Sequence, residues 1–221
     1  MQESIFIVYY VFLMFGIIVG IFRFKIFDSA MRIVLLWLFI IAIAELITYT
    51  LLKTEQHAQK YLVFHSSSIV ELILVSSYFI KLFCPKKYFA IAMISNAVLW
   101  PTLGILNIIY LQPLSQINTN MLMLESLCII TMSLYFIYRV LKNDSVINIF
   151  VNPHFWISVL WLILWSTTFF FWAFIRILYR SQWEHIDTIM NLQAFINLIV
   201  YAGIACTLLF YSKKNYSFDH T

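Results

Sequence analysis

Residues 32–52, RIVLLWLFIIAIAELITYTLL, form an apolar run whose one carboxyl group belongs to Glu45. A helix rises 1.5 Å per residue, so about 20 such residues cross the hydrocarbon core of a bilayer, which is about 30 Å thick. Of the 221 residues, 63% are hydrophobic and 11% are charged, whereas about 25% of the residues in soluble domains are charged. The composition therefore predicts an integral membrane protein.

Six further runs of the same kind predict an all-α bundle of seven transmembrane helices, a single domain over residues 1–221. The connections between the runs are too short to hold a soluble domain. Asn152 followed by Pro153 predicts an N-cap and the first residue of the sixth helix. The predicted spans cover about 4–22, 32–52, 61–82, 88–110, 119–139, 155–177 and 188–211.

The basic residues predict the orientation of these spans. Of the 14 Lys and Arg residues, ten fall on the side of the bundle that carries the C-terminus, and four fall on the other side. The positive-inside rule then places the N-terminus outside and the C-terminus in the cytoplasm of a multi-pass inner-membrane protein. Because the basic residues stand at segment ends and form no patch, we expect the lipid bilayer as a partner and no nucleic acid.

The residues that several membrane-protein chemistries require are missing from the predicted spans. The last span has no lysine for a retinal Schiff base, and only His65 lies well inside a span, which argues against a catalytic zinc site. We therefore assign no cofactor, no metal site and no catalytic residue, and we consider an enzyme the less favoured interpretation. The GIIVG of Gly16–Gly20 allows close helix approach, either inside the bundle or between the protomers of a homo-oligomer.

The stretch FHSSSIVELIL, residues 64–74, places several polar groups in the third span. At 100° per residue, His65, Ser68 and Glu71 fall on one half of the helix, and the other half is mostly apolar. A helix with a polar half and an apolar half turns its polar side toward a bundle interior or a cavity. The stretch therefore predicts a polar site inside the membrane.

Other spans bring polar groups to a similar depth, in the half of the membrane that the predicted orientation makes the outer one. Because no Lys or Arg lies deep in a span, the carboxyl groups there are expected to bind a proton, a cation or a hydrogen-bonding ligand. The alternative is that each group only holds neighbouring helices together. The predicted outward-facing pocket contains Glu45, His65, Ser68, Glu71, Glu125, Asn191 and Asn197.

The pocket favours a receptor-like or sensory membrane protein that binds a small ligand or a proton and signals to a membrane or cytoplasmic partner. One alternative is a proton-coupled small-molecule transporter, which would need a polar path into the inner half of the membrane. Another is a small membrane enzyme acting on a lipid or isoprenoid, with Glu and His as acid and base. A scaffold without a ligand is the fourth interpretation.

Several short motifs are spread along nearly the whole chain. They are FRFK at 22–25, AELITY at 44–49, FHSSSIVELIL at 64–74, MLESL at 123–127, NPHFWISV at 152–159 and a last span that contains Asn. In this order they resemble an uncharacterised family of small seven-helix membrane proteins of Bacteroidota. The resemblance implies the seven-helix fold. Members of that family are often neighbours of sensor-kinase systems, which implies a signalling role by association, and no activity or residue role carries over.

Overall fold

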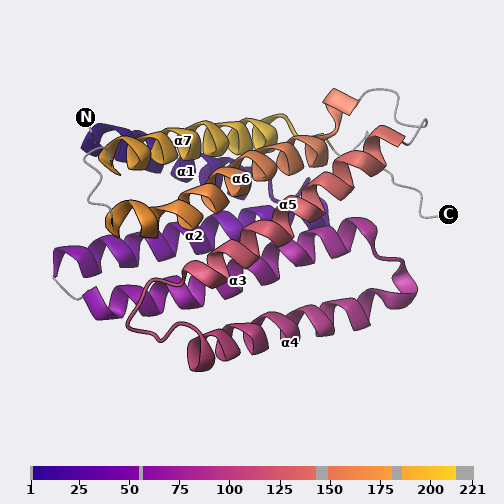
Figure 1. The fold of residues 1–221 in the computed structure, drawn as a ribbon. Coiled ribbons are helices and arrows are strands. Elements are labelled where there is room, and N and C mark those ends of the chain that lie inside the picture. The colour runs from indigo at the N-terminus through magenta and orange to yellow at the C-terminus, as the bar shows by residue number, and fades with distance from the viewer. Residues whose placement is uncertain (1, 55–56, 143–148, 181–185, 213–221) are drawn as a thin grey trace. The chain divides into compact units, whose positions relative to one another are not determined.

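The computed structural model describes residues 2–54, 57–142, 149–180 and 186–212, and within them the chain is helical without strands. Each predicted span coincides with one α-helix to within about one helical turn at either end. The helices are α1 (Gln2–Arg23), α2 (Ser29–Lys53), α3 (His57–Phe83), α4 (Lys86–Tyr110), α5 (Thr119–Lys142), the short 3-10 helix η1 (Ile149–Val151), α6 (Pro153–Arg180) and α7 (Ile186–Phe210) (Figure 1).

The helices have the length and composition of membrane spans. Among the described residues, the six helices from α2 to α7 each contain a stretch long and apolar enough to cross a bilayer, and α1 contains the shorter apolar stretch Ile7–Arg23. The prediction of a multi-pass helical membrane protein is thereby confirmed. The outside position of the N-terminus and the choice of the inner membrane stay predictions. Two of the ten basic residues on which the predicted orientation rests, Lys213 and Lys214, lie outside the described residues.

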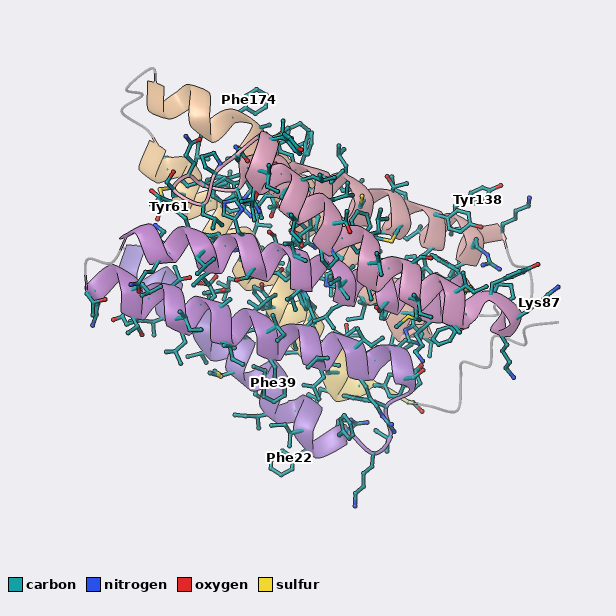
Figure 2. The ribbon with its side chains drawn as sticks, turned by 90° about the horizontal axis from the view of Figure 1, so that it is seen from below. Phe22, Phe39, Tyr61, Lys87, Tyr138 and Phe174 are labelled. Atoms are coloured by element: carbon teal, nitrogen blue, oxygen red, sulfur yellow. The ribbon has the colours of Figure 1, made fainter. Side chains whose placement is uncertain are left out.

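The chain forms two compact units. One contains α1, the second part of α5, η1, α6 and α7, and the other contains α2, α3, α4 and the first turns of α5. In the latter unit α3 packs against both α2 and α4 (Figure 1). Figure 2 shows Tyr61 and Lys87 at opposite ends of the α3–α4 pair, so the two helices are antiparallel. Gly104 of α4 lies against Ile69 of α3, where the missing Cβ permits close packing.

In the other unit, α7 packs against both α1 and α6. The Arg23 guanidinium donates a hydrogen bond of 2.7 Å to the backbone oxygen of Tyr211, so α1 and α7 end on the same side. His154, at the start of α6, pairs with the Asp28 carboxylate at 2.9 Å, and the Tyr211 hydroxyl accepts a 3.2 Å hydrogen bond from the Asp28 amide. These contacts tie the ends of α1 and α7 to the start of α6.

The first turn of α6 carries the predicted cap. The side-chain oxygen of Asn152 accepts hydrogen bonds from the backbone amides of His154 at 2.9 Å and Phe155 at 3.3 Å. These are two of the amide groups that have no partner inside the helix. Pro153 follows as the first helical residue, where its missing amide proton costs nothing. The prediction made from Asn152 and Pro153 is confirmed.

Replacing Asn152 with alanine is expected to lower the free energy of unfolding by about 1 kcal/mol, because two backbone amides in the first turn of α6 lose their acceptor. Thermal unfolding of the chain in detergent measures the loss. Asn152→Ser is the matched control, since a serine oxygen also caps a helix. Equal melting of the Ala and Ser variants would contradict a contribution from the cap.

Candidate functional site: the polar side of α3

The first turns of α3 form a buried polar network with the connection between α4 and α5. The Asn118 side-chain amide donates a 3.0 Å hydrogen bond to the Ser68 hydroxyl oxygen, and the Asn107 amide donates a 2.9 Å hydrogen bond to the side-chain oxygen of Asn118. His65 Nε2 lies 3.2 Å from the backbone oxygen of Gln116. Because a carbonyl oxygen only accepts, Nε2 carries the proton in this contact. All four side chains named here from α3, α4 and the connection are buried.

Hydrogen bonds also join the same connection to the start of α5. The Gln112 side chain donates a 2.6 Å hydrogen bond to the Thr119 hydroxyl oxygen and accepts one of 2.9 Å from the Asn120 backbone amide. His65 and Ser68 thus contact groups of this connection inside their own compact unit. Such contacts are typical of polar residues that hold helices together. Ligand binding by His65 and Ser68 stays a prediction.

Glu71 lies on α3 beside two residues of α2. Its carboxyl group is close enough to that of Glu45 for the two to interact electrostatically, and the side chain of Trp37 approaches the same carboxyl group. Glu45 and Glu71 are partly exposed as whole residues, and Trp37 is fully buried. Two like charges repel strongly where the dielectric constant is low. The α2–α3 contact therefore brings together two of the three predicted span carboxylates.

Glu125, the third of these carboxylates, is fully buried in the first turns of α5 and belongs to the same compact unit. A carboxyl group in such surroundings has to be neutralised or hydrogen-bonded, because burying a bare charge is expensive. Within the part of the chain that the structure describes, no three His, Cys, Asp or Glu side chains gather as the ligands of a metal ion.

Asn191 and Asn197 belong to α7, in the other compact unit. The Gln193 amide lies 3.2 Å from the side-chain oxygen of Asn197 and 3.2 Å from the hydroxyl oxygen of Thr168 on α6, and donates to both. The side-chain oxygen of Asn191 finds no hydrogen-bond partner among the residues described. The predicted pocket thus draws on residues of both units, and a common cavity for all seven stays a prediction.

A second network joins α3 to α4 nearer the end of α3. The Asn96 amide donates hydrogen bonds to the backbone oxygen of Ile73 at 3.0 Å and to the Ser77 hydroxyl at 2.9 Å. The Trp100 indole donates a 2.5 Å hydrogen bond to the Asn96 side-chain oxygen. Asn96 is buried and bonded to its neighbours, as a helix-joining residue would be.

Sequence reasoning missed the residues of the α4–α5 connection, Gln112 and Asn118 above all. A signal was present, because QPLSQINTN is dense in amide side chains between two apolar runs. Amide side chains each offer a donor and an acceptor, which suits them to bridge helix ends. It also missed the pairing of Asp28 with His154, since nothing local links two residues so far apart in the chain.

Compared with models of known protein families, with curated proteins and with solved structures, the chain shows no significant match. The chemistry of its own residues is therefore what any proposed function rests on.

Asn118→Ala is expected to lower the free energy of unfolding by about 1–3 kcal/mol, because the buried amide of Asn107 loses its acceptor. Thermal unfolding in detergent checks this. Gln116→Ala is the matched control in the same connection: His65 contacts the backbone oxygen of Gln116, which alanine retains. A Gln116→Ala variant that melts as low as Asn118→Ala would contradict this assignment of the network.

Proposed function

We propose that this protein is a receptor-like, sensory membrane protein in which Glu45 and Glu71 bind a proton or a small cationic or hydrogen-bonding ligand. The observation that carries the proposal is the proximity of the two carboxyl groups across the α2–α3 contact. Keeping a carboxylate in the hydrocarbon region costs about 2.5–3.5 kcal/mol even on insertion scales, so such groups are usually functional. A pair of them is more costly still, because of their mutual repulsion.

The positions of the two carboxyl groups support a coupling between ligand binding and helix packing. Binding of a proton or cation relieves the repulsion between α2 and α3, and release restores it. The bound and the unbound carboxyl pair then favour two different packings of α2 against α3. Glu71 lies near the middle of α3, about 20 Å along the helix from its last turn near Cys84. A shift of α3 would carry the change to that end, where a partner would read it.

Infrared difference spectra of the full chain in liposomes test the proton-binding step. On acidification, we expect a carbonyl band from a newly protonated carboxyl group. Glu71→Gln should abolish this band and Glu45→Gln should shift or weaken it, because each removes one member of the pair. Glu125→Gln is the matched control, a span carboxyl outside the pair, and should leave the band in place. A band that survives both pair variants and disappears in Glu125→Gln would overturn the proposal.

The rate of thiol alkylation at Cys84 tests the coupling, in a variant whose two other cysteines, Cys128 and Cys206, are replaced by alanine. We expect acidification to change this rate several-fold, and Glu71→Gln to remove the change. A rate that follows only the intrinsic pH dependence of a thiol would count against a sensory role.

Proton flux separates a sensor from a transporter. Liposomes that contain a pH-sensitive dye and the full chain should show no net flux if the pair only senses protons. A flux that Glu71→Gln abolishes would favour the proton-coupled transporter instead.

A further inference from the structure

An apolar groove lies in the compact unit that contains α6 and α7. It has a volume of about 460 Å³ and runs between η1, the first two turns of α6 and the second half of α7. This volume is within the range of about 300–1,000 Å³ that is usual for small-molecule sites. The groove is lined by Phe150, Val151, Pro153, Trp156, Leu160, Ile199, Gly203, Cys206, Thr207 and Phe210.

The groove offers almost nothing to a polar ligand. Its lining contains no charged side chain. The Trp156 indole donates its proton to the backbone oxygen of Phe150 at 2.7 Å, and the Thr207 hydroxyl donates to the backbone oxygen of Gly203 at 2.8 Å. Because the two strongest donors of the lining are engaged within the protein, the occupant that fits is apolar.

The length of the groove matches the thickness of one leaflet of the hydrocarbon core. Its walls on α6 and α7 belong to the two candidate spans Pro153–Phe174 and Thr188–Phe210, so it lies at membrane depth. Along α7 it extends from Ile199 to Phe210, about 16 Å at the rise of a helix. Half of the hydrocarbon core measures about 15 Å.

The groove is open on the outside of the chain. Phe150 and Phe210 at its helix-end rim are 71% and 79% exposed. In a membrane protein such a surface faces lipid, so acyl chains of the bilayer have direct access to the groove. Close packing forms the floor: a Cβ at Gly203 would lie 2.6 Å from Cδ2 of Leu160. A hollow between helices in this position loses van der Waals contacts unless a chain of methylene groups fills it.

We propose that this groove holds one acyl chain of a membrane lipid as a lasting bound lipid, taken from the leaflet in which α6 begins and α7 ends. The site differs from the carboxyl pair in position and in chemistry, so it stands whether or not Glu45 and Glu71 bind a proton.

Photo-crosslinking tests the site. The full chain is placed in nanodiscs with a phospholipid that carries a diazirine midway along one acyl chain, and labelled residues are mapped by mass spectrometry. We expect Val151 and Ile199 of the groove, which are 47% and 50% exposed, to be labelled several-fold more than Leu134 and Tyr138 of α5, which are 50% and 58% exposed. Equal labelling would mean that the groove contains only bulk lipid, and it would overturn the proposal.

Cys206→Trp adds an indole inside the groove and should reduce groove labelling several-fold. Leu209→Trp is the matched control, because Leu209 is an exposed residue of α7 outside the lining. It should leave groove labelling unchanged. If the wild-type groove is not labelled by the lipid and Cys206 crosslinks to Cys206 of a second copy, a second copy fills the groove. That result would refute the proposed lipid site. If Cys206→Trp does not fold, the ratio of groove labelling to α5 labelling in the wild-type chain still tests the lipid site.

Discussion

The hydrocarbon region of a bilayer contains no water, and this constraint governs both the backbone and the polar side chains of the chain. Each backbone amide and carbonyl must be satisfied within its own segment, which in a chain of apolar runs means α-helices. Several hydroxyl side chains meet the same requirement: those of Ser66, Ser68 and Thr102 each donate to the backbone oxygen four residues earlier. A polar side chain that cannot do this has to find a partner on another helix, and those partnerships set which helices meet.

The network around Asn118 illustrates how such a partnership shapes the fold. An amide that both donates to Ser68 and accepts from Asn107 joins α3, α4 and the connection between α4 and α5 at one point. The cost of burying these groups is met only when all of them are bonded, so the network specifies one arrangement of this end of the unit. The motif FHSSSIVELIL thereby divides into two roles. His65 and Ser68 face the connection, whereas Glu71 faces α2.

The two compact units present different chemistry to a ligand. The unit of α2, α3 and α4 contains two carboxyl groups, on two neighbouring candidate spans, that interact electrostatically. The unit of α6 and α7 contains an apolar groove whose indole and hydroxyl groups are already bonded. Charged groups at membrane depth attract protons and cations, and apolar hollows at the same depth attract acyl chains. The proposed proton-binding pair and the proposed lipid site belong to different compact units, so the two proposals do not conflict.

Composition and hydropathy by themselves determined the all-helical membrane class, the seven helices to within about a turn, and the Asn152 cap, because each depends on residues that are close in sequence. They also singled out Glu45 and Glu71 as the acidic residues of their predicted spans. Which groups contact each other was decided only by the tertiary structure. His65 meets Gln116 across 51 positions, and His154 meets Asp28 across 126. Helix periodicity states which side of a helix is polar, but the partner depends on packing between segments, which no local pattern contains.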